Sequence, residues 1–208
     1  MGIYVKGLLG AFSGKVGSVI GSNWRSVDYL RSLPKPSSKP ATAKQIAQRA
    51  KFALAIEFLS PMRDILNIGF NDKSQNKMTA FNQATNDLLF KIEGEYPDFT
   101  IPYPKVKFST GSLRNVAAVH SLSIEGDPTI TWTSGGGVLE GLPTDVVYLI
   151  LYHPEKADFF VQMALRGDGE CPLDPAGMGT GEFHVWVMVT NEEGTKRSAT
   201  RYLDTLTI

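Results

Sequence analysis

The spacing of hydrophobic residues changes twice along the 208-residue chain. Residues 2–33 hold short apolar and β-branched stretches between glycines, which predicts strands joined by tight turns. From Thr42 to Lys91, apolar residues recur every three or four positions, as on one face of a helix. From residue 105 onward they alternate with polar residues, as in half-buried strands. We therefore expect an α+β protein built from three successive regions.

The first region, residues 1–33, is expected to form a glycine-rich β-hairpin arm. Its predicted order is a strand over 15–20, a turn at 21–23 and a strand over 24–32. Side chains alternate between the faces of a strand, so each face of the second strand can be assigned. We expect one face to carry Arg25, Val27, Tyr29 and Arg31, and the other Trp24, Ser26, Asp28 and Leu30. Residues 34–41 are rich in proline, serine and lysine, which predicts an extended connector.

The second region, residues 42–96, is expected to form a small helical bundle. Thr42 and Gln45 have the spacing of a capping box, and the helix that follows should end near Leu59. Its second half is apolar almost all round, so we expect this half to be buried. Ser60 and Pro61 end that helix and can open a short second one, with Ser60 as its cap. A third helix is expected over 76–91.

The third region follows a proline-rich linker at 97–104 and is predicted to be all β. Glycine-rich turn clusters separate seven short apolar stretches, which is typical of a β-sandwich. The expected strands cover residues 105–109, 116–123, 128–133, 145–153, 158–165, 183–190 and 197–206.

Within this third region, three segments carry a recognisable pattern. Trp132 lies in the second expected strand, the segment 145–153 is aromatic, and 183–190 alternates His, Val, Trp and Met. Residues 105–208 therefore resemble a fibronectin type III domain, an immunoglobulin-like sandwich whose core uses such strands. His184 stands where that family often has tyrosine. The resemblance implies a sandwich fold and names no active site.

The N-terminal part carries a second pattern: Gly7-x-x-Gly10-x-Phe12-Ser13-Gly14-Lys15-Val16-Gly17, then Pro40-x-Thr42-x-x-Gln45-x-x-Gln48-Arg49. Residues 2–70 are similar to an uncharacterised bacterial domain family with the same glycine hairpin and helix start. Some of its members resemble prophage-encoded proteins. The resemblance implies a shared fold and transfers no catalytic residue.

Charge is divided unevenly along the chain, although the total is zero. The first 51 residues hold nine Lys or Arg and one acid, Asp28, which gives a local net charge of +8. The remaining residues carry 12 bases and 20 acids, a net charge of −8. A basic end of this kind is suited to nucleic acid, to an acidic partner or to the acidic part of a neighbouring copy.

We therefore predict a non-enzymatic structural or assembly protein, plausibly of a phage-like particle, that is homo-oligomeric and docks through its basic arm. The candidate partner-binding residues are Lys15, Arg25, Tyr29, Arg31, Lys35, Lys39, Lys44, Arg49 and Lys51. The alternative is a nucleic-acid-binding protein in which Arg25 and Arg31 contact phosphates and Tyr29 stacks on a base. These residues could also simply form solvated faces, with the arginines protecting an exposed strand edge.

No catalytic, cofactor-binding or metal-ligating set emerges from the sequence. Residues 10–16 differ in spacing from a phosphate-binding loop, and Val16 follows the lysine where Ser or Thr is needed. His120, His153 and His184 are far apart in sequence and lack metal-ligand spacing. Asp168, Glu170 and Asp174 lack the calcium-loop pattern, so we expect them to be solvated turn carboxylates.

The cellular context follows from what the N-terminus and the cysteine content lack. The first residues have neither the apolar core nor the cleavage site of a signal peptide. The single cysteine, Cys171, excludes an intrachain disulfide and fits a small buried or loop thiol in a reducing compartment. We expect a protein of the cytoplasm or of a virion-like particle, without membrane contact.

Overall fold

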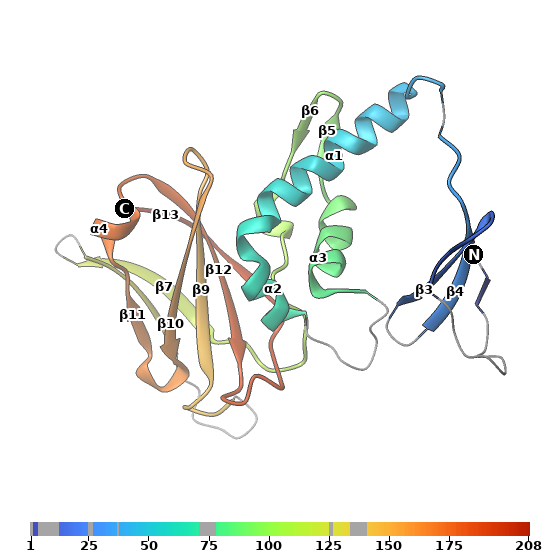
Figure 1. Ribbon diagram of the computed structural model, residues 1–208. Coiled ribbons are helices and arrows are strands. Elements are labelled where there is room, and N and C mark those ends of the chain that lie inside the picture. The colour runs from blue at the N-terminus through green and yellow to red at the C-terminus, as the bar shows by residue number, and fades with distance from the viewer. Residues whose placement is uncertain are drawn as a thin grey trace. The chain divides into compact units, whose positions relative to one another are not determined.

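The computed structural model describes residues 2–3, 13–24, 27–36, 38–70, 78–124, 127–133 and 141–208. The chain divides into two compact units, Met1–Thr42 and Ala43–Ile208, which are described here one at a time. The expected mixed α+β composition is confirmed, because strands precede a long helix and a four-stranded antiparallel sheet follows later in the chain (Figure 1).

The first unit is a four-stranded antiparallel sheet with the strand order β1-β4-β3-β2. Its strands are β1 Gly2–Ile3, β2 Gly14–Val16, β3 Val19–Trp24 and β4 Val27–Ser32. The turn predicted at 21–23 is wrong, because these residues lie inside β3. Gly17 supplies the turn instead: its φ of +60° is left-handed, which glycine adopts without a steric penalty. Gly21 is buried between Gly14 and Leu30.

Helices begin the second unit, and their bounds agree closely with the helical periodicity. They are α1 Ala43–Leu59, the 3-10 helix η1 Ser60–Met62, α2 Arg63–Gly69 and α3 Ala80–Leu89. Thr79 caps α3, because its hydroxyl accepts the Asn82 backbone N–H at 3.2 Å. Residues 76–77 of the predicted third helix lie outside the described residues. The predicted cap of the short helix is wrong, because the cap position is Leu59 rather than Ser60.

Fewer residues of α1 are buried than its apolar composition predicts. Ala55, Phe58 and Leu59 are buried, which confirms part of the expectation for the second half. Phe52, however, is 45% exposed and Glu57 is also exposed. The reason is geometric: only one face of α1 meets the core, and Phe52 lies off that face.

Residues 93–109, predicted as the end of the helical bundle, a linker and a first strand, have a different structure. They contain the hairpin β5 Glu93–Glu95 and β6 Asp98–Thr100, with a cis peptide before Pro97, and the 3-10 helix η2 Tyr103–Lys105. The strand predicted at 105–109 is wrong. Val106 and Phe108 are buried at alternate positions as a strand would bury them, but they pack as a connecting segment in the core shared with the helices.

Two antiparallel sheets complete the second unit. One has the order β10-β9-β12-β13, and the other has the order β11-β8-β7. Their strands are β7 Ala117–Ile124, β8 Asp127–Thr133, β9 Val146–His153, β10 Asp158–Leu165, β11 Glu170–Pro172, β12 Glu182–Thr190 and β13 Arg201–Thr207. The 3-10 helix η3 Arg166–Asp168 and the short helix α4 Pro175–Met178 lie between strands. Six expected strands are confirmed within a few residues, and β11 was not predicted.

Strands β9 and β12 are buried on both faces. Ile150 and Trp186 lie in a core cluster shared with the helices, whereas Leu149 and Val187 lie in a second cluster shared with Trp132 of the three-stranded sheet. Because both faces are buried, the sequences of both strands are nearly continuous hydrophobic runs. Buried residues of the helices and of strands β9 and β12 form one core cluster, and residues 43–208 form a single compact unit.

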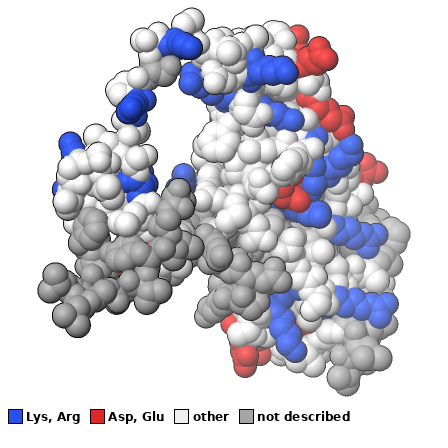
Figure 2. All heavy atoms as spheres, turned by 90° about the vertical axis from the view of Figure 1, so that its right-hand side faces the viewer, with Lys and Arg blue, Asp and Glu red and all other residues white. Residues whose placement is uncertain are grey.

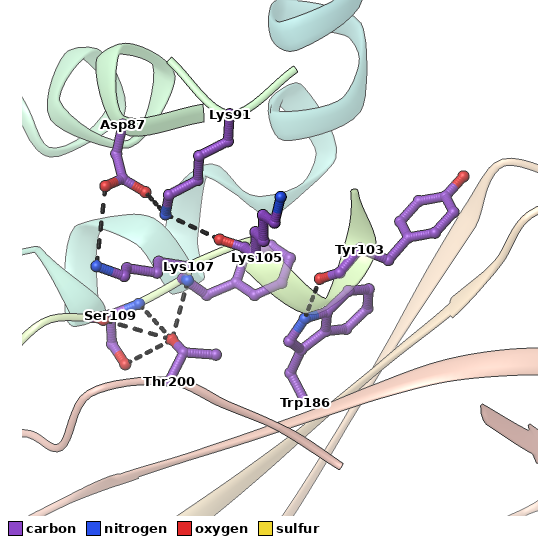
Figure 3. A network of polar contacts seen from close by, with 9 residues as sticks. Asp87, Lys91, Tyr103, Lys105, Lys107, Ser109, Trp186 and Thr200 are labelled. Atoms are coloured by element: carbon purple, nitrogen blue, oxygen red, sulfur yellow. Dashed lines mark hydrogen bonds and ion pairs between the residues drawn. The ribbon is translucent and has the colours of Figure 1, made fainter. Parts of the chain in front are cut away.

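Polar contacts hold the connecting segment, residues 103–109, against the sheet β10-β9-β12-β13 (Figure 3). The Trp186 indole N–H donates to the Tyr103 carbonyl at 3.1 Å. The Thr200 hydroxyl accepts the backbone N–H groups of Phe108 at 2.9 Å and Ser109 at 2.7 Å. Buried backbone donors that lack a strand partner are satisfied in this way.

On the helical side, Lys91 joins the same segment to α3 (Figure 3). Its ammonium group pairs with Asp87 and donates to the Lys105 carbonyl at 2.8 Å. The segment is therefore held to the helices as well as to the sheet.

Candidate interaction surface

Cross-strand register places two of the predicted cationic residues in one row of the N-terminal sheet. Lys15 of β2 is opposite Ile20 of β3, and Ile20 is opposite Arg31 of β4. Directly opposed residues in antiparallel strands project from the same face. Both cations are exposed. We name this side of the sheet the basic face and define it by Lys15, Ile20, Ser22, Trp24, Val27, Tyr29 and Arg31.

Trp24 lies on the opposite side from the one that the sequence predicted. It is paired with Val27, so it shares a face with Val27, Tyr29 and Arg31. The prediction placed Trp24 and Val27 on one continuous strand, where odd and even positions face apart. In the structure β3 ends at Trp24 and β4 begins at Val27, so the two residues are cross-strand partners. Trp24 is 49% exposed, and it adds a second aromatic ring to the basic face.

The start of the proline-rich connector also contributes to this unit. The Leu33 backbone N–H donates to the Ser18 carbonyl at 2.9 Å, which holds the chain against the β2–β3 turn. A groove of about 700 Å³ lies between the connector and the sheet. Arg31 and Lys35 both line it, together with Val19 and Leu30. The connector is therefore part of the candidate surface as well as a spacer.

The remaining predicted site residues do not all join this surface. Arg25 lies outside the described residues, and Lys39 is an exposed residue of the connector. Lys44, Arg49 and Lys51 belong to α1, in the second unit. Lys15, Tyr29 and Arg31 thus share the basic face of the first unit and Lys35 shares the groove with Arg31, whereas Lys44, Arg49 and Lys51 belong to a separate α1 group.

The α1 group has a mixed environment. Lys44 and Lys51 are seven positions apart and so lie on one side of the helix, whereas Arg49 projects from nearly the opposite side. The Lys51 ammonium lies 6.0 Å from the centre of the Phe99 ring, at the limit of a cation–π contact. Figure 2 shows Lys and Arg interspersed with carboxylates on the visible face of the 43–208 unit, in contrast to the sparsely acidic first unit.

Histidines and carboxylates outside the basic region have structural contacts. His184 Nδ1 lies 2.9 Å from the Tyr202 hydroxyl, and its ring stacks on Tyr103 at a centroid distance of 4.1 Å. Burial lowers the pKa of His184. Asp168 accepts the Leu165 N–H at 2.9 Å, and Asp174 accepts the Ala176 N–H at 3.0 Å. The side chain of His120 lies outside the described part.

The described residues contain no group of three or more His, Cys, Asp or Glu that could hold a metal ion. None of the helices in the described ranges is both long and apolar enough to cross a membrane. Cys171 is buried, and this burial raises its pKa.

Sequence reasoning missed a buried ion pair in the second unit. Asp145 and Arg166 are each 2% exposed, and Arg166 Nε lies 3.3 Å from Asp145 Oδ2. The two residues are separated by strands β9 and β10, so no local spacing signals their contact. The pair is remote from the basic residues in sequence and belongs to the packing of the sheets.

With this geometry established, the chain can be compared with known proteins. A family model described as a family of unknown function (DUF6266) matches residues 11–204. The chain belongs to this family. The match covers the N-terminal sheet from β2 onward, the helices of the described residues and the later sheets as far as Asp204 in β13, so the family pattern extends well beyond the 2–70 stretch expected from the glycine hairpin. No curated protein and no solved structure gives a significant match to this DUF6266 chain.

Proposed function

We propose that this DUF6266 chain is a non-enzymatic assembly protein whose N-terminal unit docks on carboxylates of a neighbouring copy, in a multi-subunit structure such as a phage-like particle. One observation carries the proposal: the sheet register aligns Lys15 and Arg31 on one face, and Lys35 shares a groove with Arg31. Residues beyond 51 carry a net charge of −8, so every other copy offers carboxylates that can pair with these cations.

The strength of such docking is set by the number of contacts. An exposed ion pair contributes only about 0–1 kcal/mol, so no single lysine would hold two copies together. Several pairs acting together would do so at low ionic strength. Exposed charges are screened over about 8 Å at physiological salt. The docking should therefore weaken steeply as salt is added.

The two later sheets fit a finer proposal about the fold, namely a fibronectin type III-like sandwich. In immunoglobulin-like sandwiches the first, second and fifth strands share one sheet, and the third, sixth and seventh share the other. Counting from β7, the orders β11-β8-β7 and β10-β9-β12-β13 follow this division, with the fourth strand beside the third. The buried Trp132 in the second strand adds support. In this scheme the sandwich spaces or displays the docking units.

The test compares two triple variants of the full chain that lose the same charge. Lys15→Gln, Arg31→Gln and Lys35→Gln neutralise the basic face and its groove. The control neutralises three exposed bases of the second unit, Arg114, Lys156 and Lys196. Sedimentation velocity at about 50 mM and about 500 mM NaCl reports the assembly state.

We expect wild type and control to form larger assemblies at low salt than at high salt. The basic-face variant should lack this salt-dependent step and show the same assembly state under both conditions. Equal behaviour of the two variants, or association of wild type that does not respond to salt and to these residues, would remove the basis of the proposal.

Nucleic-acid binding is the second candidate, favoured by the position of Trp24 on the same face of the sheet as Tyr29 and Arg31. Aromatic rings that alternate with cations can stack on unpaired bases while the cations meet phosphates. A single-stranded oligonucleotide titrated at several salt concentrations tests it. Binding with a steep logarithmic salt slope that decreases on Arg31→Ala, and weakens on Trp24→Ala, would place this candidate ahead of assembly.

A further inference from the structure

The sheet β10-β9-β12-β13 has two edge strands, β10 and β13, and they differ in how they are protected from pairing with another chain. Edge strands usually carry charges, prolines or bulges that prevent pairing with another chain. Strand β13 has such features: the exposed Arg201 and Asp204 lie within it, and its register with β12 shifts between Val185 and Trp186. Strand β10, at the opposite edge, has none of them between Phe159 and Leu165.

Strand β10 is also long and regular. All eight of its residues, Asp158–Leu165, pair with β9 without a register shift. The Leu165 N–H donates to the Asp168 carboxylate at 2.9 Å, so it points away from β9. Hydrogen-bonding direction alternates along an antiparallel strand. The backbone groups of Phe159, Val161 and Met163 therefore point toward the outer edge as well.

The outer edge has an apolar surface beside it. Met163 is 63% exposed and Leu165 is 46% exposed. They project from the same face of the sheet, and their cross-strand partners there are Tyr148 and Val146 of β9. A strand added to this edge would cover these side chains while it satisfied the backbone groups.

A second copy of β10 is the occupant that this edge fits. Two such strands can pair antiparallel about a twofold axis, and each then offers the other the same seven uncharged residues. The two copies of Asp158 would lie near opposite ends of the ribbon, about 24 Å apart at 3.4 Å per residue, so their repulsion is screened. The basic N-terminal segment would gain little here, because Asp158 is the one acid of this strand.

We infer that β10 is a self-association edge, through which two copies of the chain join their four-stranded sheets into one continuous sheet. This inference deepens the proposed assembly function, but it uses an apolar, hydrogen-bonding surface instead of the basic face. The two contacts therefore respond differently to salt. Docking by the basic face is lost in high salt, whereas pairing through β10 persists, because burial of apolar groups does not depend on screened charges.

Sedimentation equilibrium of the full chain in about 500 mM NaCl, where charge contacts are screened, tests the inference. The variant is Met163→Lys, which adds a charge at an exposed position of the edge and should leave the fold intact. The matched control is Phe90→Lys, which changes a residue that is 83% exposed on the helical side. Thermal melting shows whether each variant is folded.

We expect wild type and Phe90→Lys to form dimers in high salt, and Met163→Lys to raise the dimer dissociation constant about tenfold or more. A wild type that is monomeric in high salt up to about 100 μM would overturn the inference, as would a folded Met163→Lys that dimerises like the control. The high-salt dimer does not depend on whether the basic-face variant loses its low-salt association. Docking by the basic face and pairing through β10 can therefore be refuted independently.

Discussion

Replacing Asp145 by Asn should destabilise the second unit strongly, because it leaves the Arg166 guanidinium charged and buried without its counter-ion. Both side chains are 2% exposed. Asp145 Oδ2 also accepts the Leu142 N–H at 2.9 Å, and an Arg166 terminal nitrogen donates to the Arg114 carbonyl at 2.5 Å. Asn keeps the shape of Asp, so the substitution changes charge with little change in packing.

The expected magnitude follows from this burial. Breaking a buried ion pair by removing one partner costs about 3–5 kcal/mol, which is a large part of the about 5–15 kcal/mol that stabilises a typical protein. For a chain of this size each kcal/mol shifts the melting temperature by about 2–4 °C. Asp145→Asn should therefore lower the melting temperature by about 6–20 °C.

Urea unfolding followed by circular dichroism measures the free-energy change, and a double-mutant cycle isolates the pair. Asp145→Leu combined with Arg166→Met removes both charges and should be less damaging than the sum of the single changes. Asp158→Asn, at an exposed position of β10, is the control and should change stability by less than about 0.5 kcal/mol. A loss below about 1 kcal/mol for Asp145→Asn, or strict additivity in the cycle, would show that the pair is not a buried, coupled unit.

Other measurements test other parts of the structure. Because burial lowers the pKa of His184, the unfolded chain binds this proton more readily, so stability should fall as pH drops below about 6.5. Urea unfolding at about pH 7.5 and about pH 5.5 should show a smaller difference for His184→Gln than for wild type, and equal differences would contradict this reasoning. Thr200→Val leaves the N–H groups of Phe108 and Ser109 without their acceptor and should cost about 1–3 kcal/mol; an unchanged melting temperature would contradict it. Cys171 is 4% exposed and burial raises its pKa, so iodoacetamide should label it, as read by mass spectrometry, only after denaturant is added.

The sequence predicts most of the fold because hydrophobic periodicity is a local signal. The helix ending at Leu59 and the strands that contain Trp132, Leu149 and Trp186 all have apolar residues spaced so that at least one face is buried. The failures occur where local chemistry is ambiguous. The strand Glu170–Pro172 is too short to show a period, and Phe108 alternates with polar neighbours in a segment that is not a strand.

The candidate surface was predictable in composition but not in arrangement. Lys15 was identified by charge and Arg31 by charge and strand alternation, whereas their common row depends on a register set by Gly17 in the turn. Trp24 was assigned to the wrong face because the chain contains two nearby glycine-serine pairs, at 17–18 and 21–22, that could both mark a turn. A turn displaced by four residues lengthens one strand and changes which side chains share a face.

Zero-length carbodiimide cross-linking tests the central claim most directly, because it joins a lysine amine to a carboxylate only when the two are in contact. Isotopically light and heavy copies are mixed at low salt, so that mass spectrometry separates links between copies from links within one copy. Docking by the basic face predicts that Lys15 and Lys35 are linked to Asp or Glu residues beyond residue 51 of another copy, and that high salt removes these links. If both lysines are linked only within their own copy, or to no carboxylate at all, the claim that the N-terminal unit docks on a neighbouring subunit is contradicted.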